Sequence, residues 1–275
     1  MEIRVNGTTL HYESVGAGPS LLCLHGGPGT DSTSVRPLGR LAGALGVRFV
    51  CYDHRGHGRS EWVPVEECTH AQLTADVEGI RAALGLGPIT LLGISWGGYV
   101  SLMYAARYPA ALEKLIVVGA SPSHEFMRQA EANARREATP EQWRAYRALW
   151  DGSIRDNETF RRAFETIRPL YHVDKRLVAG APAASGEVRY RIDVRNFVLH
   201  HEFPRYDVRP ELGRIRCPTL VLVGRHDWIS PVEQAEEIAK RIPGARLVVF
   251  ERSGHSPQVE EPEEFVRVVR EFLAE

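Results

Sequence analysis

The sequence predicts an α/β protein in which helices cover both faces of an open, mostly parallel β-sheet. From Leu21 onward, short apolar runs alternate with helix-like stretches along the 275-residue chain. This alternation is typical of parallel strands that are connected through helices. Between Ser121 and about Tyr206 the strand-like runs disappear, and the stretch is rich in Arg, Glu and Ala. We therefore expect a helical insertion between two strands of the sheet.

The chain opens with a predicted antiparallel hairpin. Its strands are Ile3–Val5 and Leu10–Ser14, and Asn6-Gly7 between them is a strong turn signal. Six later apolar runs predict the remaining strands: Leu21–Leu24, Val47–Tyr52, Ile89–Leu92, Leu115–Gly119, Cys217–Val223 and Arg246–Phe250.

Several helices are also legible. Thr69–Gln72 and Ser230–Glu233 both fit a capping box, the second with Pro at the first helical position. A last helix is expected over Pro262–Leu273. In the insertion, one helical face gathers aromatic side chains that either pack in the core or contact a substrate: Trp143, Tyr146 and Trp150.

Ser95 lies in a Gly-x-Ser-x-Gly pattern, Gly93 to Gly97, between a predicted strand and a predicted helix. A serine exposed on such a sharp turn needs small neighbours, or the strand and the helix would collide. The pattern alone can arise by chance in a chain with 25 glycines. The strand-turn-helix context favours a nucleophile elbow.

A serine nucleophile needs a base, and the base needs an orienting group. Asp227 follows one predicted strand and His255 follows the next, in the order serine, acid, histidine. Because ligands bind at the carboxyl ends of parallel strands, these side chains are expected to converge. The alternatives are a solvated loop acid, an exposed histidine, or His226 as the base. The last is disfavoured because His226 precedes the acid.

The segment His25–Gly29 follows another apolar run. Acyl transfer needs N–H donors where negative charge develops, and glycines allow the backbone to come close to that point. We assign the two oxyanion donors to Gly27 and to Trp96, the residue after the nucleophile. A plain Gly/Pro turn is the alternative. A dinucleotide-binding loop is disfavoured because no GxGxxG follows this strand.

Taken together, these motifs resemble the α/β-hydrolase superfamily, and within it the proline iminopeptidase group. The motifs are HGGPG at His25–Gly29, DHRGHGRS at Asp53–Ser60, GISWGG at Gly93–Gly98, GRHD at Gly224–Asp227 and SGHS at Ser253–Ser256. The resemblance implies an α/β-hydrolase fold with a mostly parallel eight-stranded sheet. It also implies a catalytic domain over residues 1–120 and 208–275, and a helical cap domain over residues 121–207.

The resemblance also suggests candidates for substrate binding. Proline iminopeptidases recognise a protonated amine through carboxylates of the cap. Arg191–Phe197 is similar to the family's R-I-E-x-x-x-F stretch, with Asp193 in place of Glu, and Glu202 follows nearby. Asp193 and Glu202 are therefore candidate amine ligands, and ordinary surface ion pairing is the alternative. In the DHRGHGRS segment, His54 and His57 are interpreted as loop residues and not as metal ligands.

Composition limits the class of protein. A net charge of -1 gives no reason to expect nucleic acid or an anionic membrane as a partner. No apolar run approaches the roughly 20 residues that span a bilayer. The first residues begin a strand and not a signal peptide, so we expect a cytoplasmic protein. The four cysteines fit no metal-binding spacing and are interpreted as small buried residues. No cofactor or metal is implied.

These observations predict a serine hydrolase that cleaves a small acyl substrate through an acyl-enzyme. The favoured hypothesis is an aminopeptidase similar to proline iminopeptidases, acting on a small molecule or short peptide. A carboxylesterase or lactonase is the second hypothesis. A ligand-binding protein without catalysis is the third, and it would not need all three triad groups. Dehalogenase and epoxide hydrolase chemistry is excluded because it needs a carboxylate where Ser95 stands.

Overall fold

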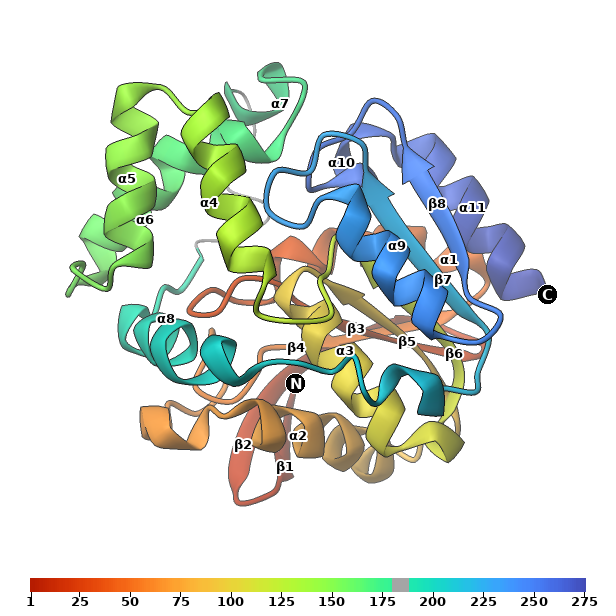
Figure 1. Ribbon diagram of the computed structural model, residues 1–275. Coiled ribbons are helices and arrows are strands. Elements are labelled where there is room, and N and C mark those ends of the chain that lie inside the picture. Colours follow the sequence, from red (N-terminus) through yellow and green to blue (C-terminus); the bar gives the residue numbers. More distant parts are fainter. Residues whose placement is uncertain (180–187) are drawn as a thin grey trace.

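In a computed structural model, which describes residues 1–179 and 188–275, the protein has an α/β fold around one sheet (Figure 1). The strands are β1 (Glu2–Val5), β2 (Thr8–Gly16), β3 (Ser20–Leu24), β4 (Arg48–Tyr52), β5 (Ile89–Ile94), β6 (Leu112–Val118), β7 (Thr219–Gly224) and β8 (Arg246–Phe250). They form an eight-stranded sheet in the order β1-β2-β4-β3-β5-β6-β7-β8. Only β1 with β2 and β2 with β4 pair antiparallel. The expected hairpin is confirmed, with positive φ at Asn6 (47°) and Gly7 (81°).

Helices cover both faces of this sheet. The helices are α1 (Ala42–Leu45), α2 (His70–Ala83), α3 (Trp96–Arg107), α4 (Phe126–Glu137), α5 (Pro140–Trp150), α6 (Asn157–Ile167), α7 (Arg176–Ala179), α8 (Ile192–Phe197), α9 (Val232–Arg241), α10 (Pro257–Glu260) and α11 (Pro262–Ala274). In Figure 1, α3 and α9 lie in front of the sheet and α1 and α11 behind it. Successive strand residues face opposite layers: Leu22 packs with the α2, α3 and α9 side, and Leu21 with the α1 and α11 side.

Between β6 and β7 the described residues form α4 to α8 and short 3-10 and π turns, but no strand. We call residues 121–207 the cap segment; its residues 180–187 lie outside the described residues. Figure 1 shows α4, α5 and α6 gathered away from the sheet, on the side toward which β7 points. The predicted aromatic face forms on α5, where Trp143, Tyr146 and Trp150 stack with ring centroids 5.3 and 4.6 Å apart.

Of the two predicted capping boxes, the first forms only its N-cap bond and the second does not form. Thr69 caps α2 by accepting from the Gln72 N–H at 3.2 Å. Ser230, by contrast, does not cap α9, which begins at Val232 without a side-chain cap. The Ser230 hydroxyl instead bonds to Ser121, and its N–H donates to Asp227. The Ser230 hydroxyl therefore makes a tertiary hydrogen bond and not the helix cap that the local pattern predicts.

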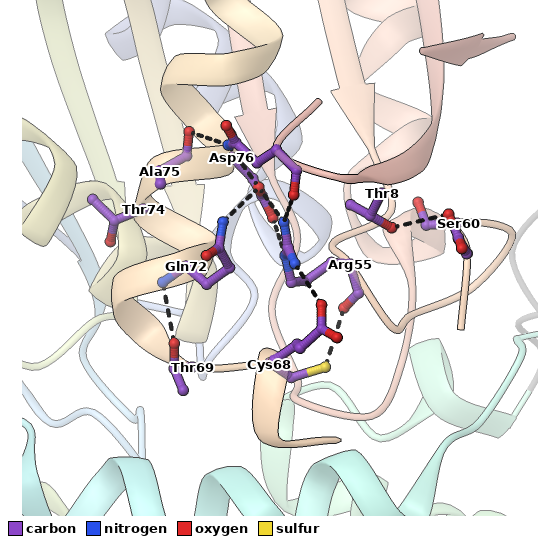
Figure 2. Close-up of polar contacts among 12 residues, drawn as sticks. Thr8, Arg55, Ser60, Cys68, Thr69, Gln72, Thr74, Ala75 and Asp76 are labelled. Carbon is purple, nitrogen blue, oxygen red and sulfur yellow. Dashed lines mark hydrogen bonds and ion pairs between the residues drawn. The ribbon is translucent and has the colours of Figure 1, made fainter. Parts of the chain in front are cut away.

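A buried ion pair between Arg55 and Asp76 stabilises the DHRGHGRS segment (Figure 2). Arg55 donates to both carboxylate oxygens of Asp76 on α2, at 2.5 and 2.7 Å, and it also bonds to the Asn6 carbonyl. The two side chains are 2% and 0% exposed. Asp53 accepts from the backbone of Ser32 and Arg59. These bonds fix the loop after β4, as the structural interpretation of this segment expects.

Among the described residues, no helix is both long enough and apolar enough to cross a membrane. The four cysteines are all buried and free.

Candidate active site

Ser95 occupies the turn between β5 and α3 with a strained backbone. Its φ of 55° and ψ of -122° are unusual for a residue with a side chain. The Ser95 N–H donates to the Val118 carbonyl at 2.8 Å, which fixes the turn to β6. A Cβ at Gly97 would collide with the carbonyl oxygens of Leu24 and His25. The glycine is needed because α3 starts directly against the end of β3.

Asp227 and His255 meet at the ends of β7 and β8. His255 Nδ1 lies 2.7 Å from Asp227 Oδ2, and both side chains are buried. The other carboxylate oxygen accepts from the N–H groups of Ile229 and Ser230, at 3.0 and 2.9 Å. Because the carboxylate accepts a hydrogen bond from the Nδ1–H group, it orients the ring. Nε2 is then the nitrogen that can take up a proton.

Ser95 and His255 line the same cavity, which measures about 330 Å³. Within the described ranges, the two side chains are not hydrogen-bonded to each other, although both face this space. Catalytic hydrogen bonds are often long before a substrate binds. The structure therefore brings serine, histidine and aspartate to one rim of the sheet, as the order of the motifs predicts.

The two predicted oxyanion donors also line this cavity. Gly27 has a φ of 68°, and its carbonyl accepts from the Thr30 backbone and hydroxyl, so the loop is folded back on itself. A Cβ at Gly26 would come within 2.9 Å of Ser95 Cβ, so this loop passes directly beside the elbow. Trp96 is the first residue of α3, and the N–H groups of a first helical turn have no partner within the helix.

Comparison with known proteins gives the family. Residues 19–262 match the family described as the alpha/beta hydrolase fold. The chain belongs to this family. It is 30% identical to "Proline iminopeptidase PfmaB" of Pestalotiopsis fici, over 98% of both chains. It is 29% identical to a 2-hydroxy-6-oxo-6-phenylhexa-2,4-dienoate hydrolase of Comamonas testosteroni, over 96% of this chain and 91% of that one. An enol-lactonase from Burkholderia xenovorans LB400 has a similar structure, with a TM-score of 0.75, 27% identity and full coverage of both chains.

These findings make the protein an α/β-hydrolase that resembles proline iminopeptidases, as its motifs predict. The predicted amine ligands, however, lie outside the α/β-hydrolase cavity that holds Ser95. Asp193 is about half exposed, and its carboxylate pairs with Arg191 at 2.7 Å. Glu202 accepts from the His70 N–H at 2.6 Å, at the start of α2. A carboxylate at a helix N-terminus is stabilised by the helix dipole, which gives Glu202 a structural partner.

A cluster of buried histidines surrounds the Trp96 ring. His54 and His57 lie with ring centroids 5.4 and 5.3 Å from it, and His70 Nε2 accepts from the Trp96 indole N–H at 3.0 Å. Burial lowers the pKa of His57 to about 3 and that of His70 to about 4. These rings are therefore neutral at pH 7 and pack against Trp96, the residue predicted to carry an oxyanion donor. Among the described residues, no group of three or more His, Cys, Asp or Glu side chains could hold a metal ion.

Several residues of the cap segment line the cavity, and sequence reasoning missed most of them. Trp150, Phe160, Glu165 and Arg195 all face the space that holds Ser95. The pattern on α5 left a substrate contact open for Trp150. Nothing in the local sequence distinguishes the other three from ordinary helix residues, because the cap segment reaches the cavity only through tertiary packing.

Proposed function

We propose that the protein is a serine hydrolase that cleaves small acyl substrates through an acyl-enzyme. The observation that carries the proposal is the Asp227–His255 hydrogen bond of 2.7 Å beside a serine held on a strained turn, at one cavity. A protein that only binds ligands would need neither the strained turn nor the oriented histidine.

In the proposed mechanism, His255 Nε2 removes the proton of Ser95, and Ser95 Oγ attacks the acyl carbon. The N–H groups of Gly27 and Trp96 stabilise the oxyanion. His255 then protonates the leaving group, and water repeats the sequence on the acyl-enzyme. Asp227 holds the imidazole tautomer throughout and stabilises the imidazolium that forms.

The cavity favours an ester or lactone over an aminoacyl substrate. Recognition of a protonated amine calls for a carboxylate, and Asp193 and Glu202 do not line the cavity. Of the described lining residues, Glu165 is the one acid, and its carboxylate pairs with Arg161 at 2.7 Å. The volume of about 330 Å³ and the aromatic walls suit a small acyl group.

An aminopeptidase is the second candidate. It is favoured by the relatives named as proline iminopeptidases, of which two are 30% and 27% identical to this chain. In that case Glu165 would have to exchange Arg161 for the substrate amine.

The test is turnover of short aryl esters, simple lactones and a prolyl arylamide by the parent and by Ser95→Ala. We expect ester turnover in the parent and a loss on the order of 10⁴ to 10⁶ in Ser95→Ala. Ser153→Ala, at an exposed position of the cap segment, is the matched control and should keep parental turnover. Near-parental activity in Ser95→Ala would overturn the proposal. Turnover of the arylamide alone would select the second candidate.

A further inference from the structure

Arg195 is a buried cation at the wall of the Ser95 cavity. It lies on α8 with 7% of its surface exposed, and it lines the cavity together with Ser95 and His255. A Cβ at Gly29 would lie 2.9 Å from Arg195 Cβ, so α8 packs directly on the loop that carries Gly27. The guanidinium therefore belongs to the same compact site as the oxyanion loop.

The partners of Arg195 are few and neutral. One Nη donates to the Leu149 carbonyl at 3.2 Å, and Nε has no hydrogen-bond partner. The guanidinium carbon lies 4.8 Å from the ring centroid of Trp150 and 5.4 Å from that of Phe160. Among the described residues, no carboxylate forms an ion pair with it. Arg55 is also buried, but its guanidinium donates hydrogen bonds to the Asp76 carboxylate and to a backbone carbonyl.

A buried guanidinium with so few partners destabilises the fold unless a ligand supplies a counter-charge. Burial of a cation without a counter-charge is unfavourable, and cation–π contacts return only part of the loss. Burial lowers the pKa of Arg195 to about 10, so the group still carries its charge at pH 7. For packing between two aromatic rings alone, an uncharged side chain of similar length would cost less.

We infer that Arg195 binds a carboxylate of the substrate, so that the preferred substrates are acyl compounds that carry a free carboxylate. The planar guanidinium donates in a fork that matches a carboxylate with two parallel hydrogen bonds. The single charge of the guanidinium balances the single charge of a carboxylate. The same cation repels a protonated amine. This inference rests on the proposed serine hydrolase function, because it names the substrate class of that site.

The test uses two esters of nearly equal shape. Mono-para-nitrophenyl glutarate carries a free carboxylate, and para-nitrophenyl pentanoate has a methyl group in its place. We expect the parent to prefer the acid in kcat/KM, and Arg195→Gln to lose roughly 100-fold on the acid with little change on the neutral ester. The ratio between the two esters is insensitive to partial misfolding, because misfolding lowers both values together.

Three further variants sharpen the result. Arg195→Lys keeps the charge without the fork and should restore part of the preference. Arg144→Gln removes the same charge at an exposed position of α5 and should keep the parental ratio. If the preference disappears in Arg168→Gln, at another arginine of the cavity wall, and survives in Arg195→Gln, the assignment to Arg195 is wrong.

A binding experiment separates this inference from the proposed function. Calorimetry with phenylpropanoate, and with its neutral amide as control, needs no turnover. Ser95→Ala protein should bind the carboxylate, and Ser95→Ala/Arg195→Gln should not. If neither ester is cleaved but this difference in binding holds, the hydrolase proposal fails and the carboxylate site stands. An unchanged ester ratio in Arg195→Gln together with equal binding in the two proteins would overturn the inference.

Discussion

Asp227 and Arg55 of the strand-end loops differ from Arg195 of the cap segment in the partners of their buried charged groups. Asp227 and Arg55 belong to loops at the sheet, and each has polar partners on both sides of its charged group. Arg195 belongs to the cap segment and has one carbonyl and two rings. A buried charged group that has its hydrogen-bond partners within the chain stabilises the fold. A charged group at a cavity that lacks such partners is available to bind a ligand.

Among the charged groups with partners in the chain, Asp227 is expected to have the largest effect on kcat. In Asp227→Asn the amide cannot hold the imidazole tautomer, so kcat on a neutral aryl ester should fall by about 10⁴. Stopped-flow or steady-state assays at pH 7 measure this, with circular dichroism to check the fold. Asp174→Asn, at a partly exposed aspartate of the cap segment, is the matched control. A kcat within tenfold of the parent would exclude Asp227 as the orienting acid.

The Arg55–Asp76 pair should show the largest effect on stability. Arg55→Met leaves the Asp76 carboxylate buried without its counter-charge, which should lower the free energy of unfolding by about 3 to 5 kcal/mol. Urea denaturation measures the loss. Arg161→Met, whose partners Glu158 and Glu165 are about half exposed, should barely change the midpoint. Equal losses in the two variants would contradict the contrast between paired burial and surface pairing.

The histidine cluster predicts a dependence of stability on pH. Burial lowers the pKa of His57 to about 3 and of His70 to about 4, below the ordinary value of 6.5. The unfolded chain therefore binds more protons, and stability is full above pH 6.5 and decreases as the pH falls from 6.5 toward 4. Each such histidine should contribute roughly 1 kcal/mol per pH unit to this slope.

His70→Gln tests this dependence, because the Gln amide oxygen can still accept from the Trp96 indole. Urea unfolding at several pH values between 6.5 and 4.5 should give a shallower slope than in the parent. His226→Gln, at an exposed histidine, should leave the slope unchanged. An identical slope in all three proteins would mean that His70 is protonated in the folded state.

The smallest effect is expected at Asp193. Its carboxylate is 54% exposed, and an Asn amide oxygen can still accept from Arg191, whose guanidinium also donates to two backbone carbonyls. Asp193→Asn should therefore change the free energy of unfolding by no more than about 1 kcal/mol. Turnover of both the ester and the prolyl arylamide should stay at the parental level. A selective tenfold loss on the arylamide would instead support the amine-binding role that the sequence suggested.

The features predicted correctly from the sequence are those that local chemistry decides. The turn at Asn6-Gly7, the elbow at Ser95 and the apolar strands follow from backbone preferences and periodicity, which act over a few residues. Ser230 and Asp193 were assigned by local pattern and resemblance, but partners distant in the chain or on the surface took their side chains. Arg195 went unnoticed because its meaning depends on which groups are absent around it.

The order of the strands has a consequence for biosynthesis. β7 pairs with β6 on the side opposite β5, yet the ribosome must complete residues 119–218 before β7 can be made. Until then β6, an apolar strand, is the outer margin of the nascent sheet. Unpaired apolar edges recruit other chains. Slow translation through the cap segment should therefore raise the demand for chaperones during expression.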